Sequence, residues 1–496
     1  MKKRFSKLAV IFLLPAFLAD GCSRSQEDAR QPPLMLYCAA GLKPPVDAIR
    51  QNYEKEYGRK VQVQYEGSGT LLSKIRIAPR GDLFLAADES YLKQAMLAGL
   101  VRERLSLATM TPVIAIRSDA GTPIHELKDL LKPDVQFSLA NPEAAAIGRK
   151  TQAILRQLQL WEQLESRART LKPTVMDLAN DVKLGTVDAA VVWDAVVAQY
   201  SELKAVDVPQ FANATVKVEV GVMQASEDPT GALHFARYLA ARDRGLMAFA
   251  AHGYAVTQGD VWADRPELVF FSGGVNRLAI QNTLREFELR EGVVLNTQFN
   301  GCGILVATMK TGQLPDAYFA CDVSFITGLA EQFDPIHDLS TTDIVVAVAR
   351  ENPRNIQALS DLAGPGLRVG VTNPQQSALG ALTENLLKEM NHWKAISQNI
   401  KSQTPTADLL VNQIRTGSLD AVFIYRANVA AVLDDLRVIS IDHPRARAIQ
   451  PYAVMLNSDH KHTMYRLLEA IRSQSSQQRF ADGGFQWLDR PATARK

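Results

Sequence analysis

Hydrophobic and polar positions follow two different periods along this chain. Val61, Val63 and Tyr65 stand at every second position, which is the period of a half-buried strand. The pattern then becomes helical over Thr70–Ile75. The apolar run at 188–193 is typical of a buried strand. Strands and helices are therefore expected to alternate.

Two longer helices have a recognisable end. The pattern predicts a helix over Val46–Tyr57 that Gly58 closes, and another over Thr283–Arg290 that ends before Gly292. Glycine often ends a helix because it adopts the left-handed conformation without steric cost. A second buried strand is predicted at 420–425. This alternation predicts an α/β fold with mainly parallel sheets and helices on both faces.

The chain contains an internal repeat. Four segments of the first half have a counterpart in the second: Leu34–Gly41 with Leu268–Val275, Tyr65–Gly69 with Phe299–Gly303, Asn141–Pro142 with Asn373–Pro374, and Gly185–Ala189 with Gly417–Ala421. The spacing is 234 positions in the first two pairs and 232 in the others. Such regular self-similarity indicates a duplicated structural unit.

The repeat and the flanking composition predict the domain organisation. We expect a signal peptide at 1–21, a tether at 22–33, a first module at 34–256, a linker at 257–266, a second module at 267–489 and a tail at 490–496. Each module is long enough for two lobes. In the first module the segments Thr111–Ile116 and Val216–Met223 are expected to form the hinge.

The N-terminus has the pattern of an export signal. A basic head from Lys2 to Lys7 precedes the apolar run Leu8–Leu18, which is shorter than the roughly 20 residues that span a bilayer. The run ends in Ala19-Asp20-Gly21-Cys22, which resembles a bacterial lipobox. That resemblance implies that Cys22 is lipidated and becomes the first mature residue. Leu18 stands one place too early and Asp20 is unusual for this motif, so an ordinary cleaved signal is the alternative.

Charge and hydropathy exclude some classes of protein. The net charge is +2, and it becomes −1 when the four basic residues and one acidic residue of the leader are removed. A nearly neutral chain without basic clusters disfavours nucleic acid as a partner. No segment after the leader is long and apolar enough to cross a membrane.

The four cysteines do not predict a metal site. Cys22, Cys38, Cys302 and Cys321 match no zinc-binding spacing. A Cys302–Cys321 disulfide is conceivable, and two small buried thiols are equally compatible with the sequence.

Four junctions between a strand and a helix could bind a ligand, because ligands of open α/β sheets bind beyond the carboxyl ends of the strands. They are Cys38–Gly41, Gly67–Gly69, Ala140–Gly148 and Thr174–Met176. Small residues and helix N-termini would present backbone N–H groups there, and Ser68 would add a hydroxyl. No Arg or Lys lies inside these turns, although Lys43 is close. Uncharged donors suit a fully ionised oxyanion, whereas a protonated phosphate would also need an acceptor.

Other polar candidates have simpler interpretations. Asp82 and Asp88 are expected to cap helices or to make interlobe hydrogen bonds rather than to catalyse. Trp193 ends a buried strand, where it could pack in the core or line the cleft. The histidines have no metal-ligand spacing, and no nucleophile lies in a recognisable pattern with a base. We therefore predict no enzyme activity, cofactor or resident metal.

These motifs together resemble the periplasmic molybdate/tungstate-binding proteins of ABC importers. The resemblance rests on Cys38–Leu42, Tyr65–Leu72, Gly81–Asp88, Asn141–Gly148 and the strand ending at Trp193. It covers the first copy and, more faintly, the second. It implies two tandem modules of the type II periplasmic-binding-protein fold, each with two lobes that close on a tetrahedral anion.

The resemblance also implies ligand positions in the first module. They are Ala40, Gly41, Ser68, Gly69, Ile147, Gly148, Val175 and Trp193. The family's first-loop serine falls on Gly41, so only backbone donors could act there. Its tyrosine hydroxyl falls on Trp193, which could offer only an indole N–H. Two side-chain ligands are thus altered.

The second module departs further from the family pattern. Its corresponding positions are Gly274, Cys302, Leu379, Ala407 and Tyr425. Val275 replaces Gly41, and Cys302 replaces Ser68 with a poorer hydrogen-bond donor. Tyr425 supplies the hydroxyl that Trp193 lacks. We expect a working first site and an altered or degenerate second site.

The sequence therefore predicts a periplasmic, lipid-anchored protein that captures a small oxyanion, molybdate or tungstate first, for an ABC permease. Sulfate, phosphate and organic acids are alternative ligands. An envelope sensor or scaffold whose modules bind a protein is the second hypothesis, and an enzyme on the same fold is the third.

Overall fold

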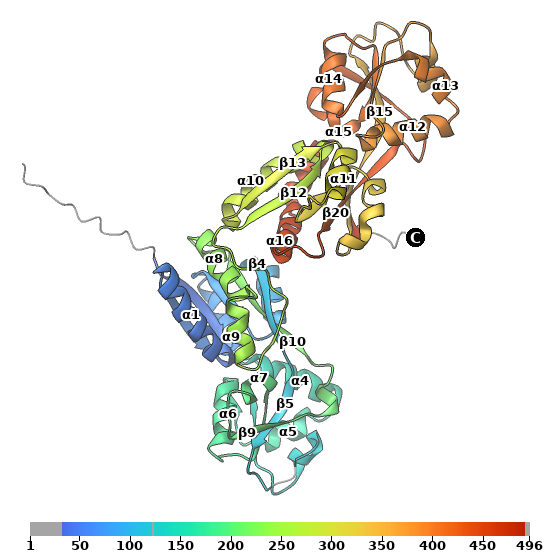
Figure 1. The fold of residues 1–496 in the computed structure, drawn as a ribbon. Coiled ribbons are helices and arrows are strands. Elements are labelled where there is room, and N and C mark those ends of the chain that lie inside the picture. Colours follow the sequence, from blue (N-terminus) through green and yellow to red (C-terminus); the bar gives the residue numbers. More distant parts are fainter. Residues whose placement is uncertain (1–31, 122–123, 492–496) are drawn as a thin grey trace, which may run out of the picture.

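A computed structural model describes residues 32–121 and 124–491. The chain forms two modules, each with an inner lobe next to the other module and an outer lobe at one end of the molecule (Figure 1). The expected signal peptide, Cys22 and most of the expected tether and tail lie outside the described residues. No helix within the described ranges has the length and apolar character needed to span a bilayer.

The inner lobe of the first module comprises 34–110 and 216–256. Its strands are β1 (Leu34–Ala39), β2 (Val61–Glu66), β3 (Leu83–Ala86), β4 (Val101–Met110), β10 (Val216–Met223) and β11 (Ala255–Val256). Its helices are α1 (Lys43–Tyr57), α2 (Ser68–Ile77), α3 (Glu89–Leu97), α8 (Pro229–Ala240) and α9 (Gly245–Ala251), with the 3-10 turn η1 (Ala40–Leu42) after β1. The sheet has the order β11-β4-β10-β3-β1-β2.

The outer lobe of the first module comprises 112–206. Its strands are β5 (Pro112–Arg117), β6 (Phe137–Ala140), β7 (Leu171–Lys172), β8 (Ala189–Trp193) and β9 (Leu203–Val206). Its helices are α4 (Ala146–Gln157), α5 (Trp161–Arg167), α6 (Val175–Lys183) and α7 (Asp194–Val197). The sheet order is β7-β6-β8-β5-β9.

The second module repeats this plan. Its inner lobe contains β12 (Glu267–Gly273), β13 (Val294–Asn300), β14 (Ala317–Phe319), β20 (Arg447–Val454), β21 (Gln486–Pro491), α10 (Arg277–Glu291), α11 (Cys302–Lys310), α16 (Lys461–Ile471), α17 (Gln474–Asp482) and the turn η4 (Gly274–Asn276). Its outer lobe contains β16 (Val369–Thr372), β17 (Ile400–Thr404), β18 (Ala421–Tyr425), β19 (Leu436–Ser440), α12 (Ala378–Glu389), α13 (Trp393–Ile396), α14 (Ala407–Arg415) and α15 (Arg426–Val429). Strand β15 (His337–Ala349) runs through both lobes.

The expected helices and strands are present. Helices α1 and α10 end at Gly58 and Gly292, whose φ values of 68° and 70° are left-handed. Strands β8 and β18 lie where the two buried apolar runs predicted them. The sheets are mixed, however, rather than mainly parallel. In the first inner lobe, β1 pairs in parallel with β2 and β3, whereas β10 runs antiparallel to β3 and β4.

The antiparallel pairs arise where the chain passes between lobes. In the first module it leaves at Thr111 and returns at Thr215, and the two hydroxyl oxygens are 2.9 Å apart. The hinge is therefore narrower than expected, since most of Thr111–Ile116 and all of Val216–Met223 lie in sheets. In the second module Ile344 replaces Pro112, and its N–H donates to Ala446 O. Proline cannot donate such a bond, which explains why β15 is continuous where β4 and β5 are separate.

The segment expected as the linker is firmly attached to both modules. The Asp260 carboxylate accepts hydrogen bonds from the amides of His462 and Thr463 at the start of α16. The indole N–H of Trp262 donates to the Tyr57 hydroxyl at the end of α1. These contacts join the two inner lobes through more than the covalent chain.

Candidate functional site

The four predicted junctions of the first module lie along the contact between its lobes. Gly41 in η1 faces the start of α6, since a Cβ built on Gly41 would lie 2.9 Å from Cγ1 of Val175. Gly67 faces the outer lobe in the same way, with Ala144 O and Pro173 O 2.3 and 2.7 Å from such a Cβ. The structure therefore brings together segments that are between 77 and 134 residues apart in sequence.

Ser68 lies at the first position of α2, with 1% of its surface exposed. Its Oγ accepts a hydrogen bond from the Ala87 amide at 3.2 Å. The hydroxyl proton remains available, because accepting that bond does not use it. Ser68 can therefore donate to a ligand at the interlobe contact.

The adjacent amides of α2 have another role. The N–H groups of Gly69 and Thr70 both donate to Ala144 O in the outer lobe, at 2.9 and 3.3 Å. Gly69, a predicted ligand residue, thus has its amide occupied by the protein in this closed arrangement.

Helices α4 and α6 present further backbone donors. The N-cap of α4 is Ala145, which has no side-chain oxygen, and the first intrahelical bond is made by Arg149 N–H. Within the described residues, the N–H groups of Ile147 and Gly148 have no hydrogen-bond acceptor. At α6, Thr174 accepts from Asp177 N–H and leaves the Val175 amide uncapped. Free N–H groups at a helix N-terminus favour an anion.

Trp193 is 1% exposed and belongs to the hydrophobic core. It ends β8 directly before Asp194, whose Oδ1 accepts from the amides of Thr111 and Ala195 at 3.1 and 2.7 Å. Burial raises the pKa of Asp194. This carboxylate is thus engaged in holding the hinge.

In the acidic pair of the sequence analysis, Asp88 caps a helix as expected, whereas Asp82 joins two segments within the inner lobe and neither caps a helix nor bridges the lobes. Asp82 accepts from the Met35 amide and from the Ser226 hydroxyl, while Asp88 caps α3 through the Ser90 amide. Asp316 accepts from Val269 N–H in the same way in the second module. No group of three potential metal ligands occurs in the described ranges.

The second module changes the site at the position of Ser68. Cys302 forms a disulfide with Cys321, which occupies the position of Ala87. The Cys321 amide donates to Cys302 Sγ at 3.0 Å, as the Ala87 amide donates to Ser68. The bridge answers a question that the sequence left open. A disulfide sulfur has no proton, so this module lacks the donor that Ser68 provides.

The other predicted positions of the second module keep their place. Gly274 lies in η4, and Leu379 and Ala407 lie in the first turns of α12 and α14. Tyr425 is 2% exposed, and its hydroxyl has no hydrogen-bond partner in the described part of the chain. Burial, with a smaller contribution from Asp322, raises the pKa of Tyr425 well above its usual value. It is therefore a neutral, unsatisfied donor.

Two comparisons with sequence families and relatives bear on these modules. The bacterial extracellular solute-binding protein family matches residues 34–255 and, a second time, residues 268–486. The chain belongs to this family. It is a tandem solute-binding protein, which agrees with the duplicated α/β modules of two lobes.

Each of two relatives matches a stretch no longer than one module of this chain. A binding protein of Haemophilus influenzae is 36% identical over 163 residues, which are 32% of this chain and 65% of the relative. The molybdate-binding protein ModA of Mycobacterium tuberculosis is 23% identical over 210 residues, 41% of this chain and 77% of the relative. The chain thus spans slightly less than two thirds of the first relative. Among solved structures, the periplasmic molybdate-binding protein of Azotobacter vinelandii is 18% identical, covers 45% of this chain and all of its own, and has a TM-score of 0.40.

Sequence reasoning missed one residue at the first cleft. The Tyr254 hydroxyl donates to Gly41 O at 2.6 Å and accepts from Gln199 Nε2 at 3.1 Å. It thereby connects η1 of the inner lobe with the outer lobe. In the second module Phe485 takes the place of Tyr254. Phe480 contacts the Phe485 ring edge-on, as Phe249 contacts the Tyr254 ring. That difference between the copies is the only sequence signal for Tyr254.

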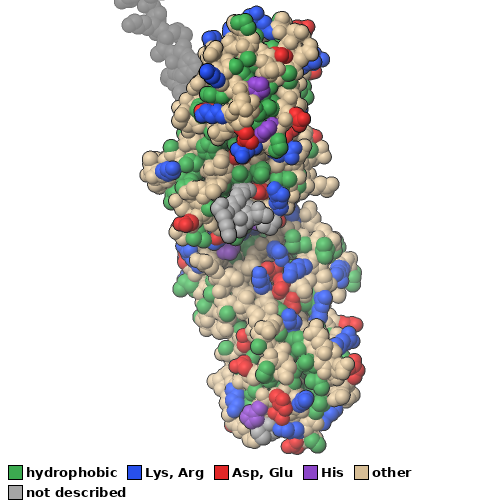
Figure 2. Space-filling model, turned by 90° about the vertical axis from the view of Figure 1, so that its right-hand side faces the viewer, with side chains coloured by type: hydrophobic (Ala, Val, Ile, Leu, Met, Phe, Trp, Pro, Cys, Tyr) green, Lys and Arg blue, Asp and Glu red, His purple; other side chains and the backbone are tan. Residues whose placement is uncertain are grey.

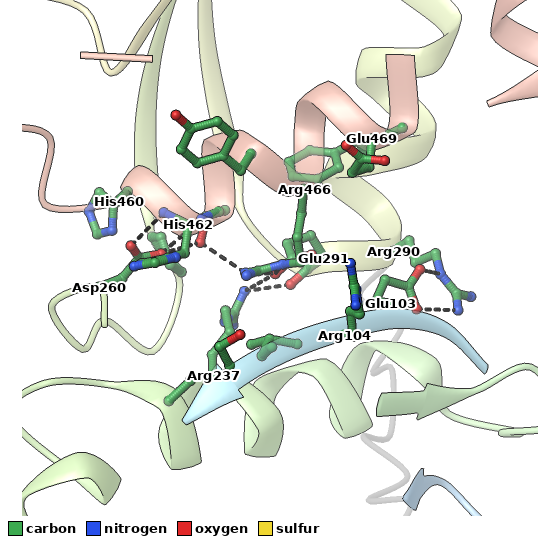
Figure 3. A pocket seen from close by; sticks show the side chains of 18 of the residues that line it. Glu103, Arg104, Arg237, Asp260, Arg290, Glu291, His460, His462, Arg466 and Glu469 are labelled. Atoms are coloured by element: carbon green, nitrogen blue, oxygen red, sulfur yellow. Dashed lines mark hydrogen bonds and ion pairs between the residues drawn. The ribbon is translucent and has the colours of Figure 1, made fainter. Parts of the chain in front are cut away.

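A cavity of about 620 Å³ lies between the modules rather than in either cleft (Figure 3). Several of its charged groups are paired with one another: Arg290 holds Glu103 in a bidentate pair, and Arg466 and Arg237 contact Glu291. On the face drawn in Figure 2, acidic and basic side chains are interspersed. The pairs of Arg290 with Glu103 and of Arg237 with Glu291 join the modules, whereas Arg466 holds Glu291 within the second module.

Proposed function

We propose that the first module captures a tetrahedral oxyanion, with molybdate or tungstate favoured, and delivers it to an ABC importer. The observation that carries this proposal is the set of uncharged donors at the interlobe contact: the Ser68 hydroxyl and the free amides of α4 and α6. Such donors stabilise a dianion through hydrogen bonds and aligned helix dipoles.

The donor set also favours a particular protonation state of the ligand. A fully ionised oxyanion needs only donors, whereas a protonated phosphate needs an acceptor as well. In the carboxylate that follows Trp193, Oδ1 already accepts from the Thr111 amide at the hinge and from the Ala195 amide in α7. We therefore rank molybdate and tungstate above phosphate, with sulfate and organic acids as alternatives. The likeness to ModA of Mycobacterium tuberculosis supports the same order.

In this proposal the second module has an altered site. Its disulfide removes the donor at Cys302, and Tyr425 offers a hydroxyl that the first module lacks. We expect molybdate to bind one module only. Binding by the first module alone would favour transport over a scaffold that requires both clefts.

The remaining parts of the proposal concern location and organisation. We propose that the chain is exported, processed before Cys22 and held at the membrane by lipid on that residue. Modules at 34–256 and 267–489 would then follow the tether, joined by the linker 257–266, without enzymatic activity. The family match supports an extracytoplasmic location.

Isothermal titration of the chain from Ser23 onward with molybdate, tungstate, sulfate and phosphate tests the ligand assignment. We expect about one equivalent of molybdate or tungstate per chain. Ser68→Ala should weaken binding about 10- to 100-fold, because a hydrogen bond to a charged group contributes about 1.5–3 kcal/mol. Ser166→Ala, an exposed serine on α5, is the control. No heat with any of the four anions would refute the oxyanion assignment.

A further inference from the structure

The two lobes of the first module touch through backbone atoms at one particular place. Gly69 and Thr70 at the start of α2 donate to Ala144 O in the loop before α4. These hydrogen bonds cross the cleft from the inner to the outer lobe. They can form only when the lobes are closed.

Glycine is needed there for space rather than for backbone conformation. A Cβ built on Gly69 would lie 1.9 Å from Glu143 O, and one on Gly67 would lie 2.3 Å from Ala144 O. Real Cβ atoms essentially never approach other atoms so closely. The φ of Gly67 is −67°, which any residue adopts. Any side chain at these positions would therefore hold the lobes apart.

The second module has the same contact although its site has changed. Gly303 N–H donates to Gln376 O at 3.1 Å. A Cβ on Gly303 would lie 2.0 Å from Gln375 O, and one on Gly301 would lie 2.3 Å from Gln376 O. The facing residues differ, since Glu143-Ala144 corresponds to Gln375-Gln376, but a backbone contact does not depend on their side chains.

We propose that these glycine pairs form a closure latch, in which Gly67 and Gly69 of the first module, and Gly301 and Gly303 of the second, let the lobes bond directly to each other. The expected effect on affinity in the first module rests on the proposed function, whereas the closure of the lobes does not. Ligand affinity scales with the population of the closed state, so the latch residues act on binding without touching the anion. The second module keeps the ability to close despite its disulfide.

Distances between the lobes test the latch directly. Nitroxide labels at Lys93→Cys on α3 and Arg156→Cys on α4 report closure of the first module by double electron–electron resonance, with and without sodium molybdate. Both sites are exposed, and Cys38 is buried. We expect Gly69→Ala to remove the short distance that the unmodified chain shows with molybdate. The control is Gly121→Ala, where a Cβ would meet nothing within 4 Å.

Affinity and stability separate a latch from a general structural role. Gly69→Ala should weaken molybdate binding at least about tenfold. The melting temperature should not fall, because alanine is a better helix former than glycine in the first turn of α2. An unchanged Kd together with an unchanged short distance in Gly69→Ala would overturn the proposal. So would the lack of a short distance in the unmodified chain under both conditions.

The second module supplies an independent test. Labels at Lys310→Cys and Lys388→Cys span its lobes, and Gly303→Ala should lengthen their distance while molybdate binding by the first module stays unchanged. If circular dichroism shows that Gly69→Ala does not fold, Gly303→Ala tests the latch instead. An unchanged distance between the labels in Gly303→Ala would overturn the latch. Absence of molybdate heat in the unmodified chain counts against the proposed function, whereas the distances still decide the latch.

Discussion

The Glu291 carboxylate lies between two arginines where the modules meet (Figure 3). Arg466 on α16 donates from Nε to both carboxylate oxygens at 3.1 and 3.2 Å, and from Nη2 at 2.5 Å. Arg237 on α8 of the first module donates to Glu291 O at 2.6 Å, with 3.8 Å to Oε1. Glu291 is 2% exposed and Arg237 is 7% exposed. Both side chains are therefore largely removed from bulk water, although they line the cavity between the modules.

Glu291→Gln removes this charge at almost constant volume. It removes the carboxylate that contacts two buried guanidinium groups, and removal of one partner from a buried ion pair costs about 3–5 kcal/mol. Glu286→Gln is the matched control on the same helix. Its partner is Arg479, but Glu286 is 58% exposed, and exposed pairs contribute about 0–1 kcal/mol.

Scanning calorimetry of the chain from Ser23 onward measures the difference. For a unit of about 150–250 residues, 1 kcal/mol corresponds to about 2–4 °C in melting temperature. We therefore expect Glu291→Gln to lower the transition that includes the second module by about 6–20 °C. The control should shift by no more than about 4 °C. Equal shifts in the two variants would refute the assignment of a buried, stabilising charge cluster between the modules.

Two further outcomes are expected. Tyr254→Phe should weaken molybdate binding about two- to tenfold in titration calorimetry, since it removes a hydrogen bond worth about 0.5–1.5 kcal/mol that orients the Gly41 loop. Tyr238→Phe, whose hydroxyl bonds Glu56 away from the cleft, is the control, and equal affinities in both variants would contradict a role for Tyr254. Cys22→Ser should move the protein from the membrane fraction to the soluble extract of expressing bacteria. Retention in the membrane fraction would show that Cys22 is not the anchor.

Much of the fold could be predicted because it depends on local patterns. The alternation at 61–65, the helix ends at Gly58 and Gly292, and the buried runs at 188–193 and 420–425 are properties of short segments. The internal repeat then assigned each segment of one module to its counterpart in the other. A spacing of 234 residues, which changes to 232, can be recognised without knowledge of any contact.

The candidate site could be predicted only in part. The sequence indicated which turns follow strands, and the structure brings those of the first module together at the interlobe contact. It did not indicate that Ala144 O occupies the Gly69 amide, or that Tyr254 bonds to Gly41. The first interaction joins the two lobes, and the second joins two segments of the inner lobe that are 213 residues apart. Both depend on how distant segments of the chain pack.

Cys302 and Cys321 illustrate the same limit. Their spacing is compatible with a bridge or with free thiols, because 19 residues of chain can hold the ends together or apart. The bridge forms because α11 begins beside the end of β14, which places the Cα atoms 6.3 Å apart. That proximity is a property of the sheet order, in which β12 lies between β13 and β14.

The sequence by itself determined the duplicated α/β plan and the set of strand ends at which a ligand could bind, since periodicity, composition and self-similarity are read residue by residue. Only the tertiary structure decided the mixed pairing of the sheets, the loss of the Cys302 donor, the backbone contact of Gly69 and the ion pair of Glu291 with Arg237 between the modules. The physical reason is the same in each case. These features depend on distances between segments far apart in the chain, and the packing of whole lobes sets those distances.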